Sequence, residues 1–334
     1  METHPLTHVE RLQAVLQGEK PDHPPVSLWR HFPVDDQTPD GLAAATIAYQ
    51  ETFDFDFIKV TPSSSYCLRD WGVRDQWLGN PEGTRQYEKR AIQSPADWGR
   101  LPLLDPRRGS LNDQITCLQM LSRHFSGKVP LVMTIFNPLS QARSLAGADR
   151  LLEHLRQFPE DVLTGLETIA RSTRSFIQAC LETGIAGIFL AVQHAQAAIM
   201  TEKEYGIFGS AFDLPLLQEV DDLWLNILHI HGEDVYFDLF TRYPVQVLNW
   251  HDRKTPPSLE EGLTRFPGVV CGGLKQWDTL VLGTPESVHA EALDALNATG
   301  GKRFILGTGC VMPITAPYGN TLAARRAVDQ FRVS

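Results

Sequence analysis

The sequence lacks any long apolar run. No stretch approaches the roughly 18 consecutive apolar residues that a membrane-spanning helix needs. The first residues, Met1 to Pro5, also lack the basic and then apolar pattern of a secretory signal peptide. We therefore expect a cytoplasmic protein with no membrane partner.

Cysteine is scarce, with 5 residues in a chain of 334. An odd number of widely separated cysteines does not resemble the disulfide framework of a small secreted domain. We expect free thiols, any of which can serve as a metal ligand. They are Cys67, Cys117, Cys180, Cys271 and Cys310.

Basic residues are fewer than acidic ones, 30 against 40, and the formal net charge is −10. Nucleic acids and anionic membranes attract basic surfaces, so the balance argues against both as partners. A small-molecule substrate is expected instead. The sequence shows no low-complexity segment and no interdomain linker, and we expect one domain over residues 1–334.

Short apolar runs rich in β-branched residues alternate with helix-length amphipathic stretches. This alternation predicts a parallel sheet, and eight such runs predict an α/β fold with a single TIM-type (β/α)8 barrel. The expected strands are residues 25–29, 55–61, 130–136, 186–192, 225–230, 245–250, 269–274 and 303–307. The clearest expected helices are residues 149–156, 159–183, 214–222, 285–299 and 320–331.

The spacer after the second expected strand is much longer than the others. Residues 63–127 include Pro95, Pro102 and Pro106 together with several charged residues. We expect an insertion that forms a hairpin or a lid over the mouth of the barrel.

Barrel enzymes place their active sites at the carboxyl ends of the strands, and titratable side chains gather at those ends here. Five of the 11 histidines, with several other polar residues, follow the expected strands. We take His194 and His251 as candidates for proton transfer or for support of other site residues. Candidate substrate-binding residues are Arg30, Tyr66, Asn137, Gln193 and Asp252.

Several of these residues have a structural alternative. Arg30 suits a carboxylate of the substrate or a surface ion pair. Asp252 suits substrate binding or the orientation of a neighbouring histidine. His194 faces substrate or is a satisfied buried histidine.

Two histidines flank one residue in His229-Ile230-His231, and Cys310 lies in the turn after the last expected strand. Alternation along a strand directs both imidazoles to one face. Imidazole and thiolate are the ligands that hold zinc, so convergence of these three side chains predicts a metal site. The alternative is a pair of hydrogen-bonded core histidines and a cysteine that only fills space.

Four stretches of the chain resemble the uroporphyrinogen decarboxylase superfamily. They are residues 7–22 with 25–26, 57–62, 136–138 with 145–147, and 309–313 with 315–317 and Asn320. The resemblance implies an α/β barrel. It implies either a decarboxylase of the haem pathway or a zinc-dependent methyltransferase that moves methyl groups between corrinoid proteins and thiols such as coenzyme M.

The residues that mark the decarboxylase branch are mostly replaced. Arg30 matches an arginine that this branch uses against substrate carboxylates, but Val34 and Arg143 stand where it has a second arginine and a tyrosine. Phe57 stands at its essential aspartate, and Thr308 at a histidine. Asp56 is one residue away and therefore faces the other side of the strand.

The methyltransferase branch fits the metal positions better. The resemblance assigns its zinc ligands to His229, His231 and Cys310, with histidine replacing cysteine at His231. Fewer thiolates leave zinc a better Lewis acid and a bound thiol a weaker nucleophile. Such a site also suits carbonyl polarisation, water activation or another borderline metal. Candidates for a fourth ligand are Glu233, His251 and Asp252.

These residues give the hypothesis of a zinc-dependent methyltransferase that uses a corrinoid or a small methylated donor and a thiol or other small acceptor. A corrinoid protein is an expected partner, and the resemblance allows a homodimer. A decarboxylase is the first alternative. A corrinoid- or tetrapyrrole-binding protein without catalysis is the second.

Overall fold

Seven of the expected strands form one curled parallel sheet in the computed structural model, which describes residues 5–331 and 333. Their order is β1-β4-β5-β6-β7-β8-β9, so each strand pairs with the next one along the chain within this sheet. The strands are β1 (Ile58–Val60), β4 (Leu131–Phe136), β5 (Gly187–Val192), β6 (Ile227–Ile230), β7 (Val247–Trp250), β8 (Val269–Leu274) and β9 (Phe304–Thr308).

The predicted first strand, residues 25–29, is not a strand in the structure, so the expected eight-stranded sheet has seven. The segment lies between β9 and β1 and makes a single bridge, from Val26 to Leu306. Ser27 donates to the carbonyl of Leu306, while Val26 accepts from the backbone amide of Asp56. Pro24 and Pro25 have no amide hydrogen, which explains why the ladder stops there.

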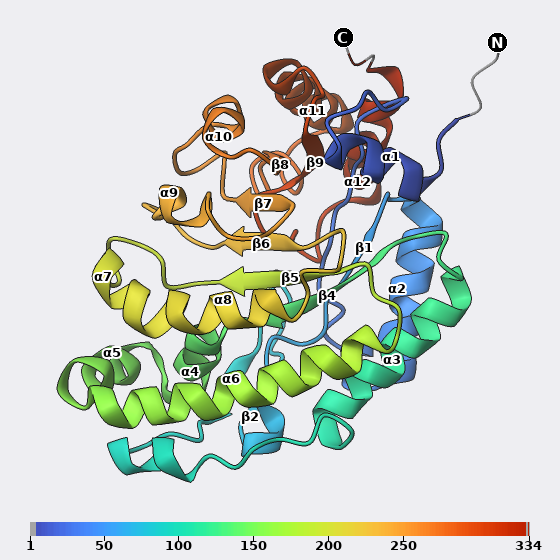
Figure 1. Ribbon diagram of the computed structural model, residues 1–334. Helices are drawn as coiled ribbons and strands as arrows, with labels where there is room; N and C mark the ends of the chain where they lie inside the picture. The colour runs from blue at the N-terminus through green and yellow to red at the C-terminus, as the bar shows by residue number, and fades with distance from the viewer. Residues whose placement is uncertain (1–4, 332, 334) are drawn as a thin grey trace.

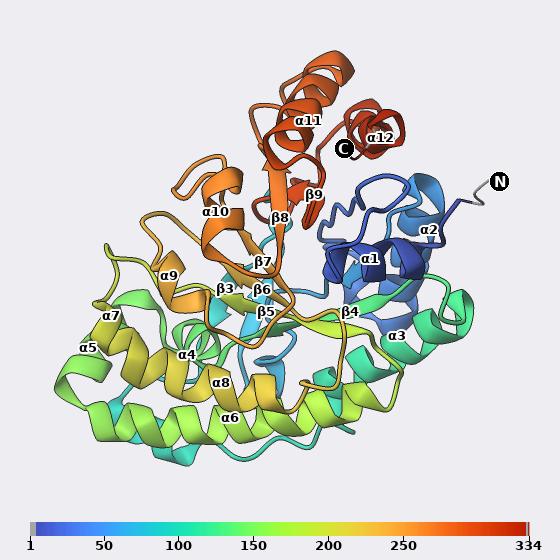
Figure 2. The same cartoon turned by 45° about the horizontal axis from the view of Figure 1, so that its top comes forward.

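Helices connect consecutive strands and pack outside the sheet, as Figures 1 and 2 show. All five clearest predicted helices are present, although the last begins at Tyr318 and ends at Ala327. No helix in the described residues is long and apolar enough to cross a bilayer. The helices are α1 (His8–Leu16), α2 (Pro39–Phe53), α3 (Gly109–Phe125), α4 (Pro138–Ala146), α5 (Ala148–Gln157), α6 (Pro159–Leu181), α7 (Glu202–Tyr205), α8 (Ala211–Gln218), α9 (Phe237–Phe240), α10 (Leu259–Arg265), α11 (Pro285–Thr299) and α12 (Tyr318–Ala327).

The long spacer between β1 and β4 contains an antiparallel hairpin of β2 (Arg74–Gln76) and β3 (Gln86–Lys89). The loop of this hairpin reaches the segments that follow β8 and β9. Pro81 accepts a hydrogen bond from the amide of Ile314, and Glu82 accepts one from the indole of Trp277. The last part of the spacer is α3, which connects the hairpin to β4 as an ordinary crossover helix.

A buried ion pair fixes the amino-terminal part of the chain against the sheet. Asp56 is fully buried, and its carboxylate accepts hydrogen bonds from Arg11 at 2.6 Å and from the amide of Val26 at 2.7 Å. Burial opposes ionisation of Asp56, but the hydrogen bond from His8, the charge of Arg11 and the Val26 amide leave its pKa lowered. The pair therefore holds α1 and segment 25–29 beside β1.

We predict that Arg11→Met destabilises the protein by about 3 kcal/mol, because it leaves the Asp56 carboxylate buried without its partner. Urea unfolding at neutral pH measures the change. Arg107→Met is the matched control, since the Arg107 pair with Glu182 is exposed and its loss should leave stability unchanged. Equal stability of the two variants would contradict the importance of the buried pair.

Candidate metal centre

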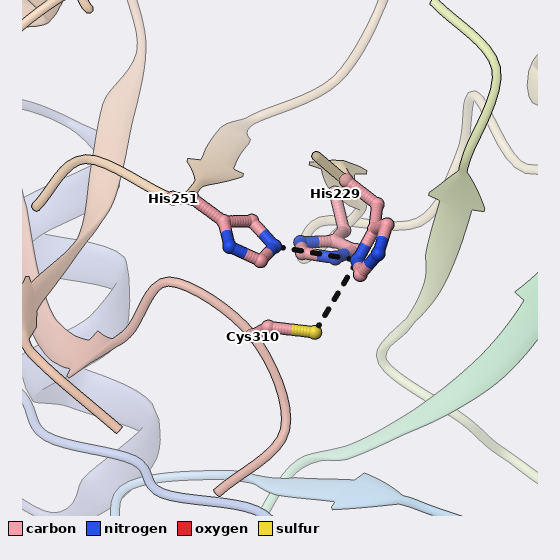
Figure 3. A group of neighbouring side chains, drawn as sticks. His229, His251 and Cys310 are labelled. Atoms are coloured by element: carbon pink, nitrogen blue, oxygen red, sulfur yellow. Dashed lines mark hydrogen bonds between the residues drawn. The ribbon is translucent and has the colours of Figure 1, made fainter. Parts of the chain in front are cut away.

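Three histidines and one cysteine converge at the carboxyl ends of the strands. One ligand atom from each of His229, His231, His251 and Cys310 lies within 4.8 Å of the others. Figure 3 shows His229, His251 and Cys310 directed toward a common point from separate segments. The structure thus brings together the three predicted metal ligands and one of the candidates for a fourth.

Strand register explains how the chain assembles this group. His229 lies on β6 and pairs with Asn249 on β7, while the amide of His231 continues the ladder to Val192 of β5. Alternation along the backbone therefore gives the imidazoles of His229 and His231 the same side of the sheet. His251 directly follows β7, and Cys310 lies in the turn after β9.

The separations within the group fit a tetrahedral zinc ion. Zinc bonds of about 2.0–2.1 Å to nitrogen and about 2.3 Å to sulfur place tetrahedral ligand atoms about 3.3–3.6 Å apart. His251 Nε2 lies 3.3 Å from His231 Nδ1, and Cys310 Sγ lies 3.6 Å from the same atom. These two separations fit a zinc site, and side-chain shifts that draw the other ligand atoms in from within 4.8 Å would complete it.

Asn249 orients the most buried of the three histidines. Its side-chain amide donates to the carbonyls of Cys271 and Thr308 at 2.8 and 2.9 Å, which directs its Oδ1 at His229. His229 Nδ1 lies 2.7 Å from that oxygen and must therefore carry the proton. His229 Nε2 is buried with no hydrogen-bond partner, the state of a nitrogen available to a metal.

Burial sets the protonation states of the group. It lowers the pKa of His229 and His231, and it lowers the pKa of His251 to about 3. All three imidazoles are therefore neutral at neutral pH, which is the form that binds metals. Burial also raises the pKa of Cys310 to about 11, so a metal must displace the thiol proton when it binds.

A cavity of about 130 Å³ borders His229, His231 and Cys310. Lys59 also lines it, and the sequence did not single this residue out because it lies within an apolar strand run. The only sequence signal was a charged residue inside that run. Burial lowers the pKa of Lys59 to about 7.

A larger chamber of about 360 Å³ adjoins this cavity, and three arginines, Arg85, Arg90 and Arg143, line it. Both spaces share Ser64, Thr84, Phe136 and Gln193, so they lie next to each other. Arg85 pairs with Asp36, whereas no carboxylate of the described chain lies within ion-pair distance of Arg90 or Arg143.

The predicted residues that follow β5 lie close to this site. Gln193 lines both spaces, as its assignment to substrate binding requires. His194 is buried, and its Nδ1 has no hydrogen-bond partner. Burial lowers the pKa of His194 to about 3, so its imidazole is neutral and a weak base at neutral pH. Both roles stay predictions.

Arg30 and Tyr66 make other contacts and line neither space. The Arg30 guanidinium donates to the carbonyls of His31 and Ile314 and lies over the ring of Phe32. The hydroxyl of Tyr66 donates to the carbonyl of Thr134 at 2.6 Å inside the core. Neither residue lies at the metal group, and the role of Arg30 and Tyr66 in substrate binding stays a prediction.

Asn137 belongs to a buried network with Asp213. Its side-chain amide donates to Asp213 at 2.8 Å, and its oxygen caps the first turn of α4. The hydroxyls of Tyr205 and Tyr243 donate to the same carboxylate. No pattern in the sequence pointed to Asp213, which lies on α8. These contacts account for Asn137 without a substrate.

Asp252 and Glu233 lie outside the metal group. The carboxylate of Asp252 accepts from the amide of Gly273 at 3.1 and 3.2 Å, and it is fully buried. The backbone amide of Glu233 donates to Gln196. Of the three residues suggested for a fourth ligand, only His251 lies with the others.

The positions expected for decarboxylase chemistry are occupied by packing residues. Phe57 is buried with Trp29 and Phe189 in the sheet interior. Asp56 faces the amino-terminal ion pair described above rather than the cavity. Thr308 donates its hydroxyl to the carbonyl of Cys310.

The comparisons with known proteins agree with this fold. The family model described as uroporphyrinogen decarboxylase matches residues 7–331. No curated protein sequence matches the chain. The solved methyltransferase from Methanosarcina mazei is 18% identical, with a TM-score of 0.86 over 98% of this chain and 99% of that chain. The B12-independent methionine synthase from Shewanella sp. W3-18-1, solved with selenomethionine, is 13% identical, with a TM-score of 0.56 over 93% and 94%. At these identities the likeness concerns the fold.

We predict that Asn249→Leu lowers zinc affinity about 10–100-fold, because His229 loses the acceptor that fixes its tautomer and ring orientation. Competition with a chromogenic chelator measures the affinity, and circular dichroism shows whether the variant is folded. Unchanged affinity in a folded variant would mean that Asn249 does not prepare the site.

We predict a pH-dependent contribution of Asp213 to stability. Burial raises its pKa to about 6, although hydrogen bonds from Tyr205, Asn137 and Tyr243 oppose the rise. The unfolded chain has a lower value, so the stabilisation is complete below about pH 4 and is lost as the pH rises through about 6. Relative to Asp213→Asn, the free energy of unfolding should fall by up to about 3 kcal/mol over that interval. Urea unfolding of both proteins at several pH values measures it, and parallel curves would exclude this role.

Proposed function

The chain belongs to the uroporphyrinogen decarboxylase family, and from that premise we propose that it is a metal-dependent methyltransferase. The observation that carries the proposal is the group of His229, His231, His251 and Cys310 beside a cavity. The likeness of the fold to two solved methyl-transferring enzymes supports the same branch of the family. Zinc is the metal that this set of ligands fits best.

A bound zinc ion would lower the pKa of a thiol acceptor so that the thiolate is available at neutral pH. The residues of the chain provide the rest of the site. His229, His231 and Cys310 would hold the metal beside the sulfur of the acceptor. Phe136 and Gln193 lie where the cavity meets the chamber. The thiol proton would pass to solvent, because burial lowers the pKa of His251 and His194 to about 3 and leaves both neutral imidazoles weak bases at neutral pH.

His251 has a role of its own in this proposal. Four ligands complete a tetrahedral site, whereas a catalytic zinc keeps one position for substrate. His251 is half-buried, and within the described residues its ring makes a hydrogen bond only to His231. We therefore assign the permanent ligands to His229, His231 and Cys310, with His251 in the position that the acceptor takes.

Methyl transfer to a thiol breaks the bond from the methyl carbon to its carrier, forms a carbon–sulfur bond and releases the thiol proton. The arginine-lined chamber has room for part of a donor larger than the acceptor. A corrinoid, free or held by a partner protein, is the donor class that the family resemblance implies. Decarboxylation is less well supported, because Phe57 and Thr308 offer no group to steady a protonated pyrrole.

We predict that the purified protein binds one zinc ion, and that His231→Ala and Cys310→Ala each reduce bound zinc at least about tenfold, since each removes a ligand. Elemental analysis after dialysis against zinc measures the content. His289→Ala on α11 is the matched control and should keep full occupancy. An unmodified protein that stays free of metal would overturn the metal site.

The activity itself is tested with methylcobalamin as donor and a panel of small thiols as acceptors. Loss of the methylcobalamin spectrum with formation of the methyl thioether is the expected result, and it should require zinc. Incubation with uroporphyrinogen tests the first alternative, and loss of its carboxylates would favour the decarboxylase. Stoichiometric corrinoid binding without turnover would favour the carrier.

A further inference from the structure

Lys59 is a buried cation with no anion beside it. The residue is 9% exposed, and its ammonium makes one hydrogen bond, to the hydroxyl of Thr61 at 3.3 Å. No carboxylate within the part of the chain that the structure describes lies within ion-pair distance of it. Glu82 lines the same cavity, but its indole partner is Trp277 and its charge acts on His231 and Cys310.

Apart from the Thr61 hydroxyl, the ammonium of Lys59 faces aromatic rings. It lies 4.5 Å from the ring centre of Phe189 and 5.8 Å from that of Trp29. The Phe189 ring in turn stacks on the imidazole of His229, with 5.4 Å between ring centres. A single aromatic ring therefore separates the charge of Lys59 from the metal group.

An uncompensated buried charge is costly, and ring faces offset only part of that cost. The burial that makes the charge costly also lowers the pKa of Lys59 to about 7. An anionic ligand in the cavity would supply the missing partner. Because Lys59 is only 9% exposed, a charge-assisted hydrogen bond to it would be strong.

The cavity itself accommodates a small ligand, and a larger one would extend into the adjoining chamber. The cavity volume of about 130 Å³ corresponds to roughly four or five non-hydrogen atoms, at about 30 Å³ each. Lys59, Thr61 and Thr134 line it together with His229, His231 and Cys310. A molecule with a carboxylate and a thiol one or two carbons apart matches these dimensions and both kinds of lining.

We propose that Lys59 binds the carboxylate of the methyl acceptor, and that the acceptor is a short thiol acid whose sulfur reaches the His/Cys group. Only the part of this proposal that concerns the sulfur of the acceptor depends on the proposed function. The carboxylate end rests on the burial of Lys59, its missing anion and the cavity beside it.

The decisive experiment compares two thiols of nearly equal size. Isothermal titration calorimetry on the zinc-loaded protein measures binding of mercaptoacetate and of 2-mercaptoethanol. The unmodified protein should bind mercaptoacetate at least about tenfold more tightly, because only this thiol has a charge for Lys59. Lys59→Met should abolish the preference without changing zinc content. Equal binding of mercaptoacetate to both proteins would overturn the proposal, as would equal binding of the two thiols to the unmodified protein.

A second measurement separates recognition from a structural role. Without ligand, Lys59→Met should unfold at a higher urea concentration than the unmodified protein, because the substitution removes a buried charge. Lys128→Met, at an exposed position, is the control and should leave the midpoint unchanged. A lower midpoint for Lys59→Met would show that the lysine stabilises the fold and would contradict the proposal.

The metal-free protein tests Lys59 independently of zinc. (Methylthio)acetate, which has the carboxylate but no thiol, should raise the melting temperature of the unmodified protein and not that of Lys59→Met. If zinc does not bind but this difference is seen, the proposed function fails and the anion site stands. If zinc binds and the difference is missing, the anion site fails and the metal centre stands.

Discussion

The side-chain amide of Asn249 joins the strands on which the candidate site depends. It donates to the backbone of both Cys271 on β8 and Thr308 on β9, and its oxygen holds His229 on β6. Parallel strands alone fix the spacing of the backbone, but they do not fix which nitrogen of an imidazole carries the proton. The two carbonyl acceptors set the orientation of the Asn249 amide, and the amide oxygen then sets the tautomer of His229. In that tautomer Nε2 carries no proton and is free to bind a metal.

The part of this arrangement that the sequence could predict follows from periodicity. Alternation placed His229 and His231 on one face, and the order of apolar runs placed Cys310 at the same end of the sheet. Seven of eight strands and the clearest helices followed from the same patterns. The remaining run failed because Pro24 and Pro25 cannot donate to a ladder, a local effect that an apolar pattern does not register.

Partners that come from distant elements could not be predicted from one sequence. Asn137 follows a strand end as a site residue would, but its side-chain amide donates a hydrogen bond to Asp213 on α8. Arg30 follows the end of an expected strand that the structure lacks, and its guanidinium donates to the carbonyl of Ile314. Lys59 is the opposite case, a site residue that the sequence did not predict. Its neighbours in sequence are apolar, yet in the curled sheet it lines the cavity. In each case the deciding contact spans a large separation along the chain.

The charges of the site would explain why one cysteine is enough for the proposed metal centre. Neutral imidazoles and a single thiolate would leave a bound divalent metal with a net positive charge. Lys59 would add to this charge, and the carboxylate of Glu82 in the same cavity would offset part of it. A second thiolate in place of His231 would make the metal group neutral. With His231, the cavity would keep a net positive charge that favours an anionic acceptor, so the replacement that would weaken a bound thiol as a nucleophile would also strengthen the selection of its charge.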